Sequence, residues 1–262
     1  MACAPASAAR GSTLLIVDSH AHVDEVPALG WIDPASELVS LMDQAGIDRA
    51  VVMTYTELPA VNPRALEYLA DQIAQYPHRL IGYVRVHPWY PEALDLLDRA
   101  FDEFQMKGVK LHPVGNLAHP ASEVTLRVIR RAAAHRAPVL FHCGDEALTT
   151  PLQIAQAAEA VPEAHIILGH MGGYFHVDEA IEVAARYPNI YLETSAMPYP
   201  NQIRHAVDTV GAQRVLFASD GPGCLPRLEV HKVRLAGLST GQEERVFATN
   251  ILELLGAVKA RV

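Results

Sequence analysis

Short hydrophobic runs rich in β-branched residues alternate with longer amphipathic stretches along almost the whole chain. The short runs are typical of buried strands, and the longer stretches carry apolar residues at helical spacing. The expected strands are 14–18, 49–54, 80–86, 108–112, 138–142, 165–169, 189–193 and 214–219, and the expected helices are 34–45, 63–76, 91–105, 122–136, 151–160, 177–187, 200–210 and 226–237. Eight such units predict parallel strands closed into a single (β/α)8 TIM barrel of the α/β class, and a further C-terminal helix is expected through Leu255.

The chain length suits one barrel without a second domain. Barrels of this kind commonly fill about 250 residues, and this chain has 262, with no linker or internal repeat. We therefore expect one domain over residues 13–262, preceded by a loose Ala-rich leader at 1–12. An open doubly wound sheet is the alternative fold. The lack of a glycine-rich phosphate loop after the first predicted strand argues against its nucleotide-binding form.

Net charge indicates which partners are unfavourable, and the cysteine content indicates the redox compartment. A formal net charge of −9 disfavours nucleic acid and anionic membranes as partners, although it says little about the small-molecule substrate that we expect. The three cysteines are scattered and form no CxxC motif, which is typical of a reduced compartment. With no secretory leader and no long apolar run, we predict a cytoplasmic protein, and barrels of this type are compatible with a homodimer.

Histidines and an aspartate gather where the predicted strands end, and barrel enzymes carry their active sites there. His20 and His22 follow the first run, and residues two apart in a strand point to the same face. His142 ends the fifth strand and Asp220 follows the eighth. Three imidazoles and a carboxylate suit one divalent ion. The predicted ion is zinc, with manganese, iron and cobalt as alternatives.

Further polar residues at the strand ends are candidate substrate contacts. Arg85 is a candidate carboxylate clamp, although a structural ion pair explains it equally well. Lys110 is expected to orient a substrate carboxylate or to pair with an acid in the site. His112 suits a pocket wall or the support of a metal ligand. His176 follows the sixth strand closely enough to reach substrate, and Glu193 suits a structural bond to Lys110 or to a ligand histidine.

Several of these motifs resemble one known family. The stretches 18–22, 109–113, 141–144, 169–173, 193–195 and 217–220 are similar, in order, to those of the amidohydrolase superfamily. The resemblance is to the amidohydrolase-related branch that includes aminocarboxymuconate-semialdehyde decarboxylase and resorcylate-type decarboxylases, and it spans roughly residues 14–255. It implies His20, His22, His142 and Asp220 as metal ligands, and His170 as the group that polarises the reacting centre or moves a proton. Binuclear members of the wider superfamily carry a carboxylated lysine in a comparable place, so the resemblance offers a carbamate bridge between two metals as the alternative for Lys110.

These observations predict a metal-dependent hydrolase. We expect a metal-activated water to attack a small carboxylate, ester, lactone or amide substrate. Asp220 would take the proton from this water and His170 would stabilise the developing oxyanion, which makes both of them catalytic. The alternative is a non-oxidative decarboxylase on the same metal site. Loop 221–226 departs from the family's pattern and the long insertions of larger decarboxylases are missing, which leaves the reaction type open. A barrel that binds a ligand without turnover is the third possibility.

Overall fold

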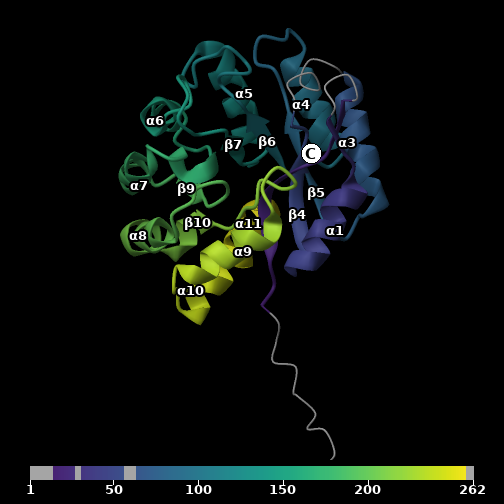
Figure 1. Ribbon diagram of the computed structural model, residues 1–262. Coiled ribbons are helices and arrows are strands. Elements are labelled where there is room, and N and C mark those ends of the chain that lie inside the picture. Colours follow the sequence, from purple (N-terminus) through teal and green to yellow (C-terminus); the bar gives the residue numbers. More distant parts are fainter. Residues whose placement is uncertain (1–13, 27–30, 56–62, 258–262) are drawn as a thin grey trace, which may run out of the picture.

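The computed structural model describes residues 14–26, 31–55 and 63–257 of the chain, so the expected leader at 1–12 lies outside them. Eight parallel strands form one sheet in sequence order (Figure 1). They are β1 (Val17–His22), β4 (Arg49–Met53), β5 (Leu80–Arg85), β6 (Gly108–Leu111), β7 (Val139–Phe141), β8 (Ile166–Leu168), β9 (Ile190–Glu193) and β10 (Val215–Leu216). The predicted α/β barrel is confirmed.

Backbone hydrogen bonds join the first strand to the segment that follows the last one. The N–H of Ser19 donates to the carbonyl of Phe217 at 3.0 Å, and the N–H of Asp220 donates to the carbonyl of His20 at 2.7 Å. Ala21 and Gly221 form a parallel bridge between the same segments. These contacts close the sheet into a barrel.

The helices surround the barrel as the amphipathic pattern predicts (Figure 1). They are α1 (Ala35–Ala45), α3 (Pro63–Gln75), α4 (Ala93–Asp102), α5 (Glu123–Ala134), α6 (Pro151–Ala160), α7 (Val177–Arg186), α8 (Pro200–Val210) and α9 (Pro226–Leu235). Proline occupies the first turn of α6, α8 and α9, where its missing N–H costs no hydrogen bond. A short antiparallel hairpin, β2 (Asp24–Val26) and β3 (Trp31–Asp33), comes between β1 and α1.

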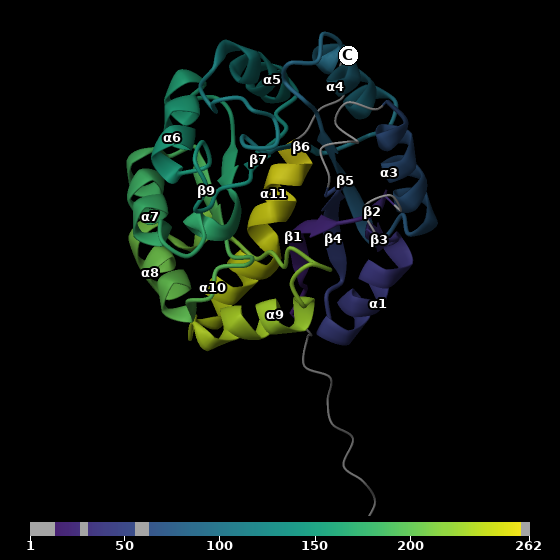
Figure 2. The same cartoon turned by 45° about the horizontal axis from the view of Figure 1, so that its top comes forward.

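The C-terminal residues cover one end of the barrel interior. They form α10 (Thr240–Glu244), a π-helical turn (Arg245–Thr249) and α11 (Asn250–Ala257), so the predicted single helix is interrupted. In Figure 2, α11 crosses the middle of the ring of helices. Ile251, Leu254 and Leu255 pack into one buried cluster with strand residues such as Val17. The Asn250 amide donates to the carbonyls of Ala212 at 2.7 Å and Val215 at 2.8 Å, which attaches α11 to the start of β10. This attachment places α11 at the end of the barrel opposite the carboxyl ends of the strands.

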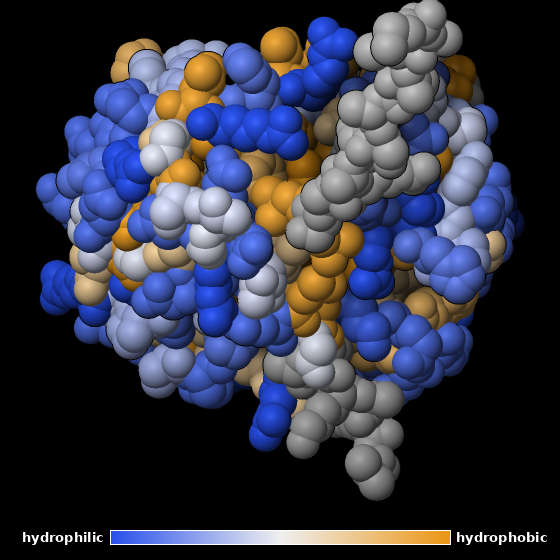
Figure 3. All heavy atoms as spheres, turned by 90° about the horizontal axis from the view of Figure 1, so that it is seen from below, coloured by the Kyte–Doolittle hydropathy of each residue, from blue (hydrophilic) through white to orange (hydrophobic). Residues whose placement is uncertain are grey.

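One face of the molecule shows how polar and apolar residues are distributed on the surface. In the face shown in Figure 3, hydrophilic residues cover most of the area and hydrophobic residues form a strip along the centre. Within the described residues, no helix combines the length and the apolar character that crossing a membrane requires.

Candidate active site

Strand β1 delivers two imidazoles to one point. His20 and His22 lie on the same face of the strand with ring centroids 4.9 Å apart, whereas Ala21 between them packs into the core outside the barrel. Asp220 reaches the same point from the turn after β10, where its φ is +57°. Its Oδ1 lies 3.0 Å from His22 Nε2 and 3.5 Å from His20 Nε2. The ligand atoms of these three residues all lie within 4.8 Å of one another.

The charge states of this group suit a divalent cation. Burial lowers the pKa of both His20 and His22, so their imidazoles are neutral and offer lone pairs. Burial alone would raise the pKa of Asp220. The imidazoles of His170, His22 and His20 outweigh it and hold that pKa well below its usual value. Two neutral imidazoles and one ionised carboxylate form a donor set that fits a divalent metal ion.

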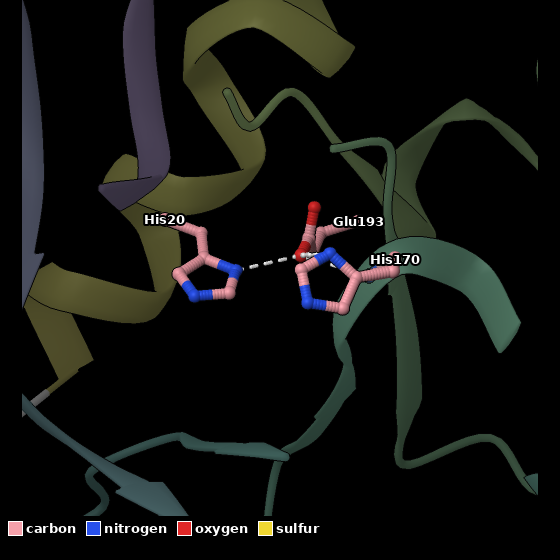
Figure 4. Close-up of side chains that lie close together, drawn as sticks. All are labelled: His20, His170 and Glu193. Carbon is pink, nitrogen blue, oxygen red and sulfur yellow. Dashed lines mark hydrogen bonds and ion pairs between the residues drawn. The ribbon is translucent and has the colours of Figure 1, made fainter. Parts of the chain in front are cut away.

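A second group, His20, His170 and Glu193, lies on the other side of the His20 ring (Figure 4). His20 Nδ1 lies 2.9 Å from Glu193 Oε1, and the same oxygen accepts the backbone N–H of His170 at 2.9 Å. The other oxygen, Oε2, accepts the N–H of Ser195 at 2.6 Å. Because the lone pairs of Glu193 point at hydrogen atoms, this group suits a hydrogen-bonded support better than a cation. We therefore place the metal on the Asp220 side of His20.

His170 occupies an unusual backbone position. It lies in the 3-10 turn Gly169–Gly172 directly after β8, with φ +61°, whereas the sequence indicates a simple strand end. Its Nε2 lies 3.2 Å from His142 Nδ1, and His142 Nε2 lies 3.3 Å from Glu146 Oε2. Burial lowers the pKa of His170 to about 3, so its imidazole is neutral. His142 thus stands one imidazole away from the His20, His22 and Asp220 group, and its role as fourth ligand stays a prediction.

Two buried cations border the same group. Lys110 is 2% exposed, and its Nζ lies 2.9 Å from His20 Nε2. Burial, together with nearby Arg85, lowers the pKa of Lys110 to about 7. Arg85 ends β5, and its Nη1 donates to the carbonyl of Thr54 at 3.1 Å and to that of Tyr55. Burial lowers the pKa of Arg85 to about 10, so this side chain stays charged near neutral pH.

These side chains meet in a cavity of about 370 Å3 at the carboxyl ends of the strands. His112 stacks on His142 with centroids 4.2 Å apart and an angle of 5° between the rings. The described lining residues are His22, Tyr55, Arg85, Lys110, His112, Val114, Gly115, His142, His170 and Asp220.

Two residues are placed differently from the sequence analysis. His176 is not among the described lining residues of this cavity. It caps α7, with Nδ1 3.7 Å from Glu179 Oε2, and its substrate contact stays a prediction. Glu146, which contacts His142, is absent from the sequence-based set. The sequence does place this carboxylate four residues after His142, which ends a strand. The residues between them form a loop, however, and a loop has no periodicity from which the direction of a side chain could be predicted.

Comparison with known proteins identifies the family. The family model described as Amidohydrolase matches residues 17–257, which includes every residue of the site. The chain belongs to the amidohydrolase family. As a member, it is an enzyme with the superfamily's barrel, and the predicted resemblance is confirmed. No curated protein matches the sequence.

Solved structures share the fold of this amidohydrolase at low sequence identity. The 5-carboxyvanillate decarboxylase from Sphingomonas paucimobilis is 15% identical with a TM-score of 0.74, and the match covers 94% of this chain and 100% of that one. A 2,6-dihydroxybenzoate decarboxylase in complex with 2,6-dihydroxybenzoate is 17% identical with a TM-score of 0.73, covering 93% and 100%.

A third solved structure was determined with a metal ion. The 5-carboxyvanillate decarboxylase from Novosphingobium aromaticivorans, in complex with manganese and 4-hydroxy-3-methoxy-5-nitrobenzoic acid, is 17% identical with a TM-score of 0.75, covering 92% and 96%. In this amidohydrolase, the described residues His20, His22 and Asp220 bring together three ligand atoms that could hold one divalent ion.

Proposed function

We propose that this amidohydrolase is a metal-dependent, non-oxidative decarboxylase that acts on a small hydroxylated aromatic carboxylate. The observation that carries this proposal is the buried Arg85 guanidinium, with the Lys110 amine, in the same cavity as the metal-binding group. A guanidinium that lines a cavity can bind a substrate carboxylate in a bidentate geometry. The cavity volume of about 370 Å3 suits a small ligand. The named decarboxylase neighbours, whose substrates are aromatic carboxylates, support the same class.

We assign one divalent ion to His20, His22, His142 and Asp220. When bound, the ion supplies Lewis-acid stabilisation of an ionised substrate oxygen. Zinc follows from the ligand types, and manganese is the ion bound in decarboxylase neighbours. The neutral imidazoles and the ionised carboxylate are ready to bind either ion without prior loss of a proton.

The side chains of the site bind and orient the substrate and transfer the proton. Arg85 binds and orients the substrate carboxylate, and Asp220 accepts the proton of the substrate hydroxyl as that oxygen ionises. Asp220 returns this proton to the ring carbon that carries the carboxylate. The carbon–carbon bond then breaks, its electron pair re-forms the aromatic ring, and CO2 leaves. His170 Nε2 contacts His142 Nδ1, and both imidazoles line the cavity. This contact holds the two imidazoles in place beside the groups that transfer the proton. One proton from solvent balances the reaction, and no water is consumed.

Hydrolysis on the same site is the second candidate. It is favoured by Asp220, an ionised carboxylate that both lines the cavity and belongs to the metal-binding group. In that reaction Asp220 takes a proton from the attacking water, and His170 stabilises the oxyanion of an ester, lactone or amide. The two reactions differ in their products: hydrolysis incorporates one water molecule, and decarboxylation releases CO2.

The test is a direct measurement of products. Protein loaded with manganese or zinc is incubated with hydroxybenzoates and a carboxyvanillate, and in parallel with aryl esters and lactones in 18O-labelled water. CO2 release and product NMR report decarboxylation, and 18O in the product acid reports hydrolysis. Asp220→Asn should abolish turnover, whereas His205→Asn, an exposed histidine on α8, should not. Ester hydrolysis with no CO2 from any carboxylate would overturn the decarboxylase proposal in favour of the second candidate.

A further inference from the structure

Glu193 is a fully buried carboxylate whose hydrogen bonds reach two histidines of the site. It is the last residue of β9, is 0% exposed, and lies inside the barrel between His20 and His170 (Figure 4). Its Oε1 is 2.9 Å from His20 Nδ1, from the His170 backbone N–H and from Ser195 Oγ. Its Oε2 accepts the Ser195 N–H at 2.6 Å. Every direction around the carboxylate thus presents a donor.

We propose that Glu193 is a positioning residue that sets the tautomers of two site imidazoles at once, that of His20 directly and that of His170 through Ser195. This inference rests on the proposed metal site, because the tautomer decides which nitrogen of His20 can bind the ion. Neither Glu193 nor Ser195 lines the cavity among the described residues, so both act through the histidines.

The His20 branch follows from the chemistry of a carboxylate. An oxygen that already accepts backbone N–H groups is an acceptor, so His20 Nδ1 must carry the hydrogen that it donates to Glu193. His20 Nε2 then carries the lone pair. The contact of His20 Nε2 with Lys110 Nζ at 2.9 Å is compatible with this tautomer, because a lysine side chain can donate a hydrogen both as an ammonium and as a neutral amine. The lone pair therefore points to the side where His22 and Asp220 lie.

The His170 branch runs through a hydroxyl. Ser195 Oγ donates its one hydrogen to Glu193 Oε1 at 2.9 Å, so toward His170 the same oxygen can only accept. His170 Nδ1, 3.0 Å from Ser195 Oγ, must then carry a hydrogen, which leaves the lone pair on Nε2. That nitrogen is the one turned toward His142 and the cavity.

An amide cannot replace this carboxylate. In Glu193→Gln, an NH2 group at the Oε1 position would face the His20 and His170 N–H groups, and at the Oε2 position it would face the Ser195 N–H. Either orientation places two donors together in a buried site, which favours the opposite tautomer of His20 or a rotated ring. Partners that orient a ligand histidine typically contribute about 10–100-fold in metal affinity.

Two variants distinguish the effect of Glu193 on His20 from its effect on His170. Glu193→Gln disturbs both histidines, whereas Ser195→Ala removes only the hydroxyl that orients His170. Titration of the metal-free proteins with Mn2+ should show a loss of affinity of about 10–100-fold for Glu193→Gln and no change for Ser195→Ala. With the substrate found in the product screen, Ser195→Ala should lower kcat and leave KM unchanged. Far-ultraviolet circular dichroism and thermal unfolding establish that each variant is folded.

Imidazole NMR on the wild-type protein tests the same inference without a variant. In 15N-histidine-labelled protein, the long-range proton–nitrogen spectrum should show hydrogen on Nδ1 of both His20 and His170, with the peaks assigned by His20→Asn and His170→Asn. Hydrogen on Nε2 of His20 would overturn the inference, as would an unchanged Mn2+ affinity in folded Glu193→Gln. If the wild-type protein binds no Mn2+ or Zn2+, the metal site itself fails, and the NMR spectrum still decides the role of Glu193.

Discussion

A single methyl group placed at Gly169 should disturb the turn that carries His170. A Cβ at this position would lie 2.6 Å from the backbone carbonyl oxygen of Phe141 and 3.4 Å from Glu193 Oε1. Ordinary carbon–oxygen contacts begin near 3.3 Å, so the turn and β7 must separate by roughly 0.7 Å. The obstacle is the backbone of the last residue of β7, which cannot rotate away as a side chain can. Overpacking of this kind costs about 1–3 kcal/mol in the free energy of unfolding.

Urea unfolding followed by circular dichroism measures this cost. Gly169→Ala should lower the free energy of unfolding by about 1–3 kcal/mol, and the unfolding temperature should fall by roughly 2–12 °C. Gly241→Ala is the matched control, because Gly241 lies in α10 and a Cβ there meets nothing within 4 Å. That variant should be neutral or stabilised by up to about 1 kcal/mol. Equal urea midpoints for Gly169→Ala and the wild type would refute the close approach of this turn to β7.

Three further outcomes follow from the structure. Asn250→Ala removes two hydrogen bonds and leaves the Val215 carbonyl without its side-chain donor, whereas the Ala212 carbonyl keeps the backbone N–H of Val215, so the free energy of unfolding should fall by about 1–3 kcal/mol in urea. Arg85→Met removes the proposed partner of a substrate carboxylate, which should raise KM by about 10–100-fold in steady-state kinetics. The unfolding temperature should also fall, because the carbonyls of Thr54 and Tyr55 lose a donor. An unchanged KM in the folded variant would exclude Arg85 from substrate binding. Burial raises the pKa of the Cys224 thiol to about 11, so iodoacetamide should modify this residue slowly at pH 8 and faster as the pH approaches 11, which peptide mass mapping can follow. Rapid modification of Cys224 at pH 7 would contradict that environment.

The parts of the fold that depend on local pattern were predictable, and the parts that depend on distant partners were not. The alternation of strands and helices placed all eight barrel strands, because each buried run is recognisable by itself. The sequence predicts the first strand at 14–18, yet β1 runs Val17–His22, since its polar second half pairs both with β4 and with the backbone of the 217–221 segment. The last strand is only Val215–Leu216, because the Phe217 N–H bonds to the carbonyl of Val246 in the π-helical turn. Neither partner can be inferred from the run itself.

The candidate site shows the same division. The same-face arrangement of His20 and His22 follows from strand alternation alone, and the structure has it. The positive φ of His170 was not predictable, because the turn after β8 is held by the tertiary contact of its N–H with Glu193. Glu146 was missed for a related reason: its contact with His142 depends on the path of a loop.

The barrel seam also has a consequence for when the protein acquires its metal during synthesis. His22 and Asp220 are 198 positions apart, and the backbone bonds between their segments are the ones that close the barrel. On a ribosome adding about 5–20 residues per second, the histidine pair emerges roughly 10–40 s before its carboxylate partner exists. A nascent chain therefore presents two histidines without the pocket that selects among ions. Binding of an ion by the complete donor set would therefore follow the synthesis of Asp220 and the closure of the barrel.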